Sequence, residues 1–372
     1  MIDPSLLTPD TRLYLRPIWF ATSPVGLDGR TARMGGGLIW FQGYEVTARH
    51  ADVIQRDRVA VPDFEEWCGH LADPLRHRAQ ALAANISAIR PPLALRDRMI
   101  RFDVPQVMGI LNMTPDSFSD GGKHVGDPSA AADAGFGMAA AGAAMIDVGG
   151  ESTRPGAEKV WEGDEIARIV PVIERLAAAG VPVSVDTRKA AVMEAALAAG
   201  AALVNDVSGL AHDPRAMEVA ARSACPVVLM HAPSSGADPH DGGVYDDVVI
   251  DVFDWFEDRI AACEDAGIAR QKIIVDPGLG FGKTLAENLA IINRLAMYQG
   301  LGVPVLLGAS RKRMIGALSN EAPADARLGG SLALAMRGVE AGVQMLRVHD
   351  VAETLQLVHV WRGLRDAALM SG

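Results

Sequence analysis

The chain has 372 residues, of which 49% are hydrophobic and 22% are charged, as in an ordinary globular protein with enough apolar material for a large core. Its net charge of −11 argues against a general nucleic-acid-binding surface and against an anionic membrane as a partner. An anionic small substrate stays compatible with this charge wherever basic residues converge locally.

The cysteines and the hydropathy pattern both favour a cytoplasmic protein. Cys68, Cys225 and Cys263 lie far apart, in neither zinc-ligand nor disulfide spacing, so we expect free thiols in a reducing compartment. No apolar run reaches the roughly 18 residues that a membrane span needs. The first residues, MIDPSLLTPDTR, lack the basic and apolar regions of a signal peptide, so we expect no export.

Residues 1–100 carry scattered tryptophans and tyrosines but no chemical motif. The segment FEEWCGHLADPLRHRAQALAANI predicts a helix that breaks near Pro74, because proline cannot continue an α-helix. Two prolines followed by charges make residues 90–98 typical of a linker. We therefore expect residues 1–100 to form a small accessory α/β region of unknown role, and residues 101–372 to form the main domain.

From about residue 104 a pattern recurs. An Ala-rich helical segment ends in glycine, a short apolar run follows, and a polar residue closes it, as in AAGAALVNDVSG. Glycine is expected past a helix end because it adopts the left-handed conformation without strain. The short β-branched runs are typical of strands buried on both faces of a parallel sheet. These runs lie near 107–111, 144–147, 183–185, 203–205, 226–230, 272–275, 304–308 and 345–348.

Eight alternating strand and helix units over about 265 residues predict a (β/α)8 TIM barrel for residues 101–372. The alternative is a doubly wound open sheet. That fold does not need eight evenly placed units, and its dinucleotide-binding fingerprint is missing after the first strand. The predicted fold class is thus α/β, a TIM barrel preceded by the accessory region.

Polar side chains follow every predicted strand, at the end where barrel enzymes carry their chemistry. A single one of them would be explained equally well as a helix cap or a loop hydrogen bond. A polar group at the end of every strand instead predicts one site at one mouth of the barrel. In chain order these groups are Asn112, Asp147, Asp186, Asn205, His231, Asp276, Ser310 with Arg311 and Lys312, and Arg347 with His349.

The segment DPGLGFGKT, residues 276–284, invites comparison with a nucleotide-binding P-loop. That motif needs a glycine where this chain has Pro277, so we reject a P-loop. Asp276 follows a buried run and is better interpreted as a carboxylate aimed into the barrel. A carboxylate there can accept two parallel N–H bonds from an amidine-like ring edge, and the glycines would let backbone approach a flat ligand.

Basic side chains gather after the last two strands, in SRKRM at 310–314 and LRVHD at 346–350. A solvated charged turn would explain the first cluster equally well. Together with Arg154, however, Arg347 and His349 could bind a phosphate or pyrophosphate. Asn112 could then give one oxygen to Mg²⁺, which takes few protein ligands beside phosphate oxygens.

Seven segments in order resemble the dihydropteroate synthase family, the pterin-binding barrel enzymes of folate synthesis, over about residues 105–369. They are LNMTPDSFSDGG, IDVGGESTRPGA, SVDT, VNDVSG, DPGLGFGKT, GASRKRMIG and LRVHDV. The resemblance implies that 6-hydroxymethyl-7,8-dihydropterin pyrophosphate condenses with p-aminobenzoate to give 7,8-dihydropteroate and pyrophosphate. It also implies Mg²⁺ as a cofactor and a homodimer as the assembly.

The resemblance further implies roles for single residues. The implied pterin-binding residues are Asp186, Asn205, Met230, Asp276 and Lys312. The implied pyrophosphate-binding residues are Arg154, Arg347 and His349, with Asn112 as the Mg²⁺ ligand. The implied p-aminobenzoate pocket comprises Phe118, Thr153, Arg154, Pro155, Phe281 and Ser310. The resemblance also implies that Asp186, Lys312, Arg347 and His349 carry the catalysis.

A dissociative mechanism agrees with these residues. The arylamine is a poor nucleophile, so catalysis gains when pyrophosphate leaves first. The cationic methylene that results is delocalised into the pterin, and Asp186 is placed to stabilise it. No nucleophilic side chain is needed, and loops such as 114–122, with Phe118 as an aromatic wall, would exclude water.

Some features depart from the family pattern. The segment APSSGADPHDGGVYDD, 232–247, replaces the usual loop, Arg188 and Arg313 stand at positions expected to vary, and residues 1–100 have no counterpart in the minimal fold. Two alternatives remain. A folate- or corrinoid-dependent methyltransferase would keep Asp186, Asn205 and Asp276 but would not use TPDSFSDGG or STRPGA. A catalytically silent pterin-binding paralogue would be expected to lose those loops.

Overall fold

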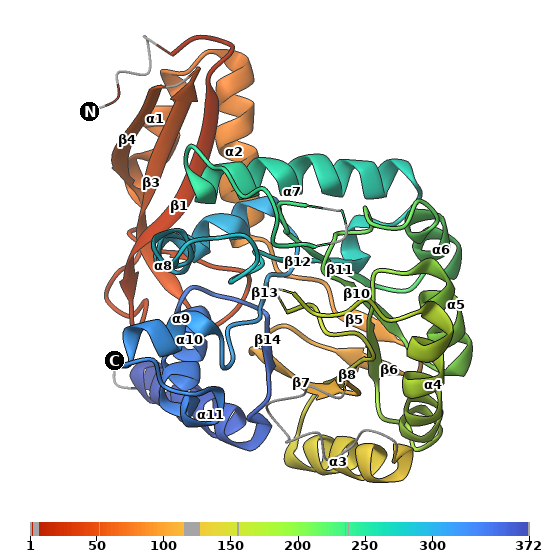
Figure 1. Cartoon of the computed structure of the whole chain (residues 1–372). Coiled ribbons are helices and arrows are strands. Elements are labelled where there is room, and N and C mark those ends of the chain that lie inside the picture. The colour runs from red at the N-terminus through yellow and green to blue at the C-terminus, as the bar shows by residue number, and fades with distance from the viewer. Residues whose placement is uncertain are drawn as a thin grey trace.

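The computed structural model describes residues 2, 7–51, 53–114, 127–154, 156–234, 236 and 238–370. Two parts pack against each other: a ring of helices around a central sheet, and a smaller unit of strands and helices that sits on the outside of that ring (Figure 1). Within the part of the chain described, no helix is both long and apolar enough to cross a lipid bilayer.

The central sheet is a closed parallel barrel. Its strands run in the order β12-β11-β10-β9-β8-β7-β14-β13, and a parallel bridge between Val275 and Val305 joins the two end strands. The open-sheet alternative is therefore wrong and the predicted (β/α)8 barrel is confirmed. The strands are β7 (Gln106–Asn112), β8 (Met145–Gly149), β9 (Val183–Asp186), β10 (Leu203–Asp206), β11 (Val227–Met230), β12 (Ile273–Asp276), β13 (Leu306–Leu307) and β14 (Met345–Val348).

Helices follow the strands and form the outer layer (Figure 1). Gly142 ends α3 with φ of 110°, the left-handed cap that the Ala-rich segments predicted. The helices are α3 (Pro128–Ala141), α4 (Glu162–Ala178), α5 (Ala190–Ala199), α6 (Ala216–Ser223), α7 (Val248–Asp265), α8 (Leu285–Arg294), α9 (Arg313–Leu318), α10 (Leu328–Glu340) and α11 (Val351–Met370). Short 3-10 turns are η3 (Arg270–Lys272), η4 (Leu295–Leu301) and η5 (Ala324–Ala326).

Residues 90–98 are not a linker, and that interpretation was wrong. Strands β5 (Leu93–Leu95) and β6 (Arg98–Ile100) pair as an antiparallel hairpin. Its apolar side chains, with Phe102, pack into one cluster with residues of the barrel strands such as Met108 and Met145. The hairpin therefore closes the amino-terminal end of the barrel, opposite the predicted site. The sequence did not predict these strands because the prolines and charges dominate the segment, although residues alternate between buried and exposed in β5.

The amino-terminal unit is an antiparallel sheet with two helices. Strand β3 (Trp40–His50) is central and pairs with β1 (Arg12–Ala21), β2 (Ala32–Arg33) and β4 (Val53–Ala60). A 3-10 turn, η2 (Val61–Asp63), leads into α1 (Phe64–Gly69), and α2 (Asp73–Ser87) follows. The predicted helix break is confirmed, and Pro74 lies in the first turn of α2, where its missing N–H costs nothing.

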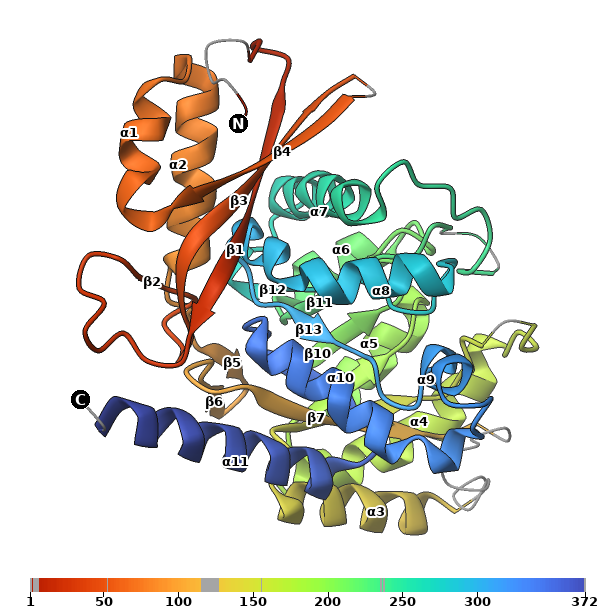
Figure 2. The same ribbon diagram turned by 90° about the vertical axis from the view of Figure 1, so that its left-hand side faces the viewer.

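This unit packs beside α7 rather than over the barrel mouth (Figures 1 and 2), and its β1 and α2 also contact η4. Its buried apolar side chains belong to the same continuous core as those of the outer barrel layer. Tyr14 marks the contact: its ring meets Phe253 of α7 edge-on at 5.5 Å, and its hydroxyl donates to Asp254 at 2.8 Å. The unit is thus fixed on one side of the barrel.

Candidate active site

A pocket opens at the carboxyl ends of the barrel strands. The strand register puts Asn112, Gly149, Asp186 and Asn205 side by side on neighbouring strands. The pocket is lined by Thr153, Asp186, Asn205, Val207, Met230, Asp276, Gly278, Leu279, Phe281, Gly308, Lys312 and Arg347. Five of the strand-end side chains that the sequence singled out therefore meet in one place: Asp186, Asn205, Asp276, Lys312 and Arg347.

Two carboxylates flank Arg347 at the floor of the pocket. Its Nε donates to Asp147 at 2.6 Å, and its Nη2 donates to Asp186 at 2.6 Å. Asn205 also donates to Asp147, at 3.0 Å. Burial is the largest influence on the Asp186 carboxyl and raises its pKa, Arg347 opposes that rise, and Asp147 adds to it. Asp147, which sequence reasoning noted but gave no role, therefore orients both Arg347 and Asn205.

Asp276 and Lys312 both line the pocket, and their charges interact. Asp276 accepts a hydrogen bond from the Gly278 amide at 2.8 Å, and burial raises its pKa. A Cβ on Gly308 would stand 3.2 Å from the other carboxylate oxygen, so this glycine keeps the approach to Asp276 open. Burial lowers the pKa of Lys312 to about 8, while Asp276 opposes that fall. The pair offers a flat ligand an acceptor and a donor.

Aromatic and loop side chains form the outer wall. The Lys312 ammonium lies 4.4 Å from the centre of the Phe281 ring. The His240 imidazole stacks on the same ring, with 4.8 Å between centroids and 11° between planes. Its Nε2 also lies 2.9 Å from the carbonyl oxygen of Thr153. Sequence reasoning missed His240 because it belongs to the segment 232–247, which departs from the family pattern.

His349 is held as a neutral imidazole. Its backbone N–H donates to Ser310 Oγ at 3.2 Å, and that hydroxyl lies 3.0 Å from His349 Nδ1. Burial and the neighbouring cations, Arg347 first, lower the pKa of His349 to about 3. The Ser310 hydroxyl can donate to Nδ1 or accept from it, so the ring nitrogen that carries the proton depends on which of these bonds forms. In either form the imidazole is neutral and not a cation.

The basic segment 310–314 separates into different environments. Only Lys312 lines the pocket. Arg311 forms an ion pair with Asp350, and Arg313 begins α9. Sequence reasoning grouped the three cations because it could not see which direction each side chain takes. Of the three cations, Lys312 therefore lies in the pocket, Arg311 forms an ion pair with Asp350, and Arg313 belongs to α9.

Lys283, the lysine of GFGKT, was also missed as a site residue. Its ammonium lies 3.0 Å from His231 Nδ1 and donates to the carbonyls of Gly278 at 3.0 Å and Phe281 at 3.2 Å. Burial lowers its pKa to about 7. The lysine therefore holds the loop after β12 in shape, and it does not act as a P-loop lysine.

The segment after β8, which carries Thr153 and Arg154, is anchored by charge. Glu151 accepts from Lys189 at 3.0 Å and forms an ion pair with Arg188 at 3.4 Å. Lys189 also donates to the buried Glu165 at 2.7 Å. Arg188, noted only as an unusual residue, thus takes part in loop anchoring.

Some predicted site residues cannot be placed in this way. Phe118 and Pro155 lie outside the described residues. Asn112 ends β7 next to the pocket, and both its Oδ1 and Asp186 lie within 4 Å of where a Cβ on Gly149 would stand. Among the residues described, no three His, Cys, Asp or Glu side chains gather as a metal site.

Comparison with known proteins agrees with this geometry. The family described as pterin binding enzyme matches residues 108–349. The dihydropteroate synthase of Escherichia coli is 46% identical over 257 residues, which are 69% of this chain and 90% of that protein. A solved structure of the Xanthomonas albilineans synthase with 4-aminobenzoic acid superposes with a TM-score of 0.69 at 46% identity, covering 74% of this chain and 98% of the other. The same enzyme in complex with 7,8-dihydropteroate gives 0.67 at 43%, covering 74% and 99%.

Proposed function

The chain belongs to the pterin-binding enzymes and, within them, to the dihydropteroate synthases, and we propose that it condenses 6-hydroxymethyl-7,8-dihydropterin pyrophosphate with p-aminobenzoate to 7,8-dihydropteroate and pyrophosphate. It is accordingly a transferase. The observation that carries the proposal is one pocket that joins a polar floor, from Asp186 to Lys312, to an aromatic wall at Phe281. A flat, hydrogen-bonding ring and an arylamine need these two kinds of surface.

The polar floor fits the pterin. Asp276 would accept two N–H bonds from the amidine-like edge of the ring, and Asn205 and Asp186 would contact the opposite edge. Lys312 would donate to a ring acceptor, since it lines the same pocket as Asp276. Met230 is buried at the end of β11 and would pack its thioether against the ring face.

The pyrophosphate would lie where Arg347, His349 and Arg154 approach the pocket. Arg347 keeps further N–H groups beyond the two bonded to carboxylates, because a guanidinium carries five. His349 would give its Nε2–H in the tautomer in which Ser310 donates to Nδ1. Ser310 was assigned to the p-aminobenzoate pocket, but its hydroxyl is bonded to His349, so we propose that it acts on the pyrophosphate side.

The side chains near Asn112 could bind Mg²⁺ only in a site where pyrophosphate and water supply most of the ligands. One amide oxygen beside Asp186 suits an ion that takes most of its ligands from phosphate oxygens and water. Asn112 would hold the ion at the pyrophosphate end. Bound there, Mg²⁺ would neutralise charge on the departing group.

The residues of the chain support a dissociative reaction. The bond between the methylene carbon and the pyrophosphate oxygen breaks first, and the electron pair leaves with pyrophosphate. Asp186 stabilises the cationic methylene, which shares its charge with the pterin. The amine nitrogen then bonds to that carbon and loses a proton. Arg347 and His349 stabilise the leaving group by hydrogen bonds aimed at its developing charge.

The arylamine would approach from the aromatic wall. Thr153 and Phe281 line this part of the pocket, and Arg154 is adjacent in sequence to Thr153. We keep Phe118 and Pro155 as proposed p-aminobenzoate contacts on the family pattern alone. The methyltransferase and silent-paralogue alternatives are less favoured because the chain aligns with synthases over 90% of the length of the Escherichia coli enzyme.

Domain limits, assembly and location are further proposals. We retain residues 1–100 as the accessory region and 101–372 as the pterin-binding domain, with the β5–β6 hairpin as the element at which the two meet. A homodimer is supported by apolar side chains exposed on α11, among them Val360 and Leu364. A cytoplasmic location is supported by the three free cysteines.

An incorporation assay tests the function. Purified protein is incubated with labelled p-aminobenzoate, dihydropterin pyrophosphate and Mg²⁺, and each component is left out in turn. We expect labelled dihydropteroate only when both organic substrates are present, and an increase when Mg²⁺ is added. Absence of labelled product in the complete mixture contradicts the synthase proposal, and product formation that chelation leaves unchanged contradicts the Mg²⁺ proposal.

A further inference from the structure

The loop between β11 and α7 contacts the arylamine side of the pocket. His240 from this loop stacks on Phe281 and reaches the carbonyl oxygen of Thr153. Both partners line the pocket, whereas His240 itself does not. His240 therefore links the segment after β8 to the segment after β12, and its position affects the shape of the wall between them.

The same loop fits closely against its surroundings. A Cβ on Gly243 would stand 1.9 Å from the carbonyl oxygen of Gly282, so the two backbones touch. The carbonyl of Gly236 accepts from Arg188 at 3.2 Å and lies 3.0 Å from His212 Nδ1. The loop therefore packs against the barrel on both sides of His240, and the start of α7 is its next fixed point along the chain.

Three acidic residues, Asp246, Asp247 and Asp251, lie where the loop meets α7, and the carboxylates of two of them bond to the backbone there. Asp247 caps the helix by accepting from the amides of Val249 at 3.1 Å and Ile250 at 3.3 Å. Asp251 accepts from the amides of Asp246 at 2.9 Å and Asp247 at 3.2 Å. These bonds set the direction in which the chain enters the helix.

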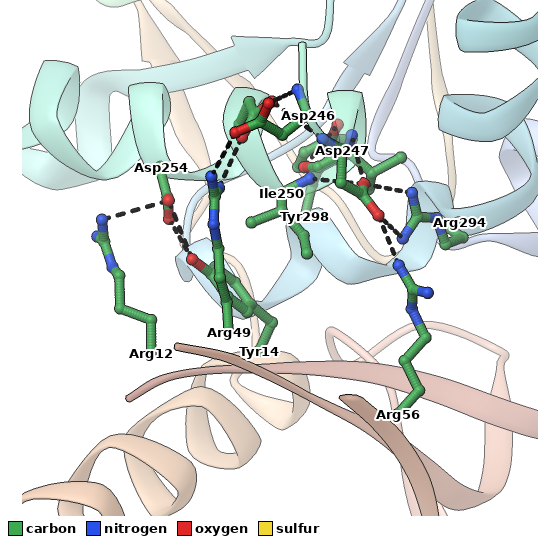
Figure 3. A network of polar contacts seen from close by, with 12 residues as sticks. Arg12, Tyr14, Arg49, Arg56, Asp246, Asp247, Ile250, Asp254, Arg294 and Tyr298 are labelled. Carbon is green, nitrogen blue, oxygen red and sulfur yellow. Dashed lines mark hydrogen bonds and ion pairs between the residues drawn. The ribbon is translucent and has the colours of Figure 1, made fainter. Parts of the chain in front are cut away.

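Arginines of the amino-terminal sheet bind these three carboxylates (Figure 3). Arg49 of β3 donates to Asp251 at 2.7 Å and to Asp246 at 3.1 Å. Arg56 of β4 donates to Asp247 at 2.5 Å. Asp247 also pairs with Arg294 of the barrel, so it joins the sheet, the loop and α8. Elsewhere on α7, Arg12 and Arg78 bind Asp254 and Glu257, further from the loop.

We propose that the amino-terminal sheet is a positioning element for the p-aminobenzoate side of the site. Arg49 and Arg56 fix the start of α7, and this fixes the loop that carries His240. His240 in turn holds Thr153 and Phe281 at the distance that the arylamine needs. The proposal rests on the proposed function, and it gives residues 1–100 a role in substrate affinity, separate from stability alone.

Two matched pairs of arginines allow a direct test. The test variant is Arg49→Ala with Arg56→Ala, whose side chains are 22% and 41% exposed. The control is Arg78→Ala with Arg12→Ala, at 25% and 44%, which removes ion pairs to the same helix away from the loop. Steady-state KM is measured for each substrate in the full-length protein, beside the thermal midpoint of unfolding.

We expect the test variant to raise the KM for p-aminobenzoate about 3- to 10-fold, the range for loss of one net hydrogen bond, with the KM for the pterin substrate unchanged. His240→Ala should have the same signature. Because both changes act on one loop, combining them should add little to the larger single effect. The control should lower the unfolding midpoint without moving either KM.

Several outcomes overturn the inference. These are an equal rise in both KM values, an equal effect of the control pair, or full additivity with His240→Ala. If the test variant fails to fold, Arg49→Lys with Arg56→Lys replaces it, and its KM for p-aminobenzoate should lie between those of the wild type and His240→Ala. If the wild type turns over normally and KM is unchanged in all variants, the positioning role is rejected but the proposed function stands. If the wild type shows no turnover, the proposed function itself is rejected.

Discussion

Paired charged side chains are buried at the barrel mouth, whereas they are partly exposed at the interface of the amino-terminal sheet. At the mouth, Arg347 lies between carboxylates, and the side chain of Asp147 is fully buried. At the interface, Arg12 is 44% exposed and Asp254 is 20% exposed. Burying a charge without its partner is costly, so the arrangement at the mouth leaves little freedom, whereas exposed pairs contribute little each. Dense buried charge marks the reaction site, and dispersed half-exposed charge marks a surface that holds two units in place.

The largest effect should come from the buried charges. Asp186→Asn keeps the size of the side chain but removes the negative charge that stabilises the cationic methylene. We expect kcat to fall about 10²- to 10³-fold, as when one preorganised electrostatic group is lost. Turnover is measured at saturating substrates, and circular dichroism checks the fold. The matched control is Asp254→Asn at the interface, which should leave kcat unchanged, and unaltered turnover in Asp186→Asn would remove this residue from the mechanism.

The next effect concerns the hairpin between the two regions. Leu95 is 2% exposed in the β5–β6 hairpin, which closes the amino-terminal end of the barrel, whereas Met99 on the same hairpin is 61% exposed. Leu95→Ala should lower the free energy of unfolding by about 2–5 kcal/mol, because it leaves a cavity. Denaturant titration measures it, with Met99→Ala as the control that should change little. Equal small losses in both variants would show that the hairpin is a linker after all.

A smaller effect should appear with pH. His349 has a folded-state pKa of about 3, below the ordinary value of 6.5, so the unfolded chain binds its proton first as pH falls. The neutral histidine therefore destabilises the fold progressively below pH 6.5, by about 1–2 kcal/mol between pH 7 and 5. His349→Asn should flatten this part of the stability profile. An identical profile for the variant and the wild type would contradict a buried neutral His349.

The smallest effect should come from the exposed interface pair. Arg12→Ala removes contacts to Asp254 and Glu257 and should cost less than about 1 kcal/mol of unfolding free energy. Raising the salt concentration should shrink the difference, because exposed pairs are screened. A loss as large as that of Leu95→Ala would mean that the two regions are held together in the same way, and the comparison would fail.

Much of the barrel could be predicted from the sequence because each strand and its polar end are local features. The runs near 203–205 and 272–275 became β10 and β12, and Asn205 and Asp276 line the pocket as their position at strand ends implied. The hairpin was misread because its burial depends on the barrel interior, which no local pattern reveals.

What the sequence could not give depends on pairs distant in the chain. The neutral state of His349 follows from burial and from neighbouring cations, Arg347 first. The two carboxylate contacts of Arg347 join residues 200 and 161 positions apart. His240 had no recognisable pattern, because its partners Thr153 and Phe281 come from other strands' loops. Arg49 and Arg56 were not singled out from the sequence, because their carboxylate partners beside α7 lie 202 and 191 positions away in the chain (Figure 3).

The central claim is that the polar floor and the aromatic wall of one pocket unite two substrates. The most direct measurement is mass spectrometry of the products, with pyrophosphate counted in the same reaction, for the wild type and for Asp276→Asn. We predict 7,8-dihydropteroate and pyrophosphate in equal amounts from the wild type, and a large rise in the KM for the pterin substrate in the variant. Pyrophosphate without dihydropteroate, or an unchanged KM in Asp276→Asn, would contradict the account.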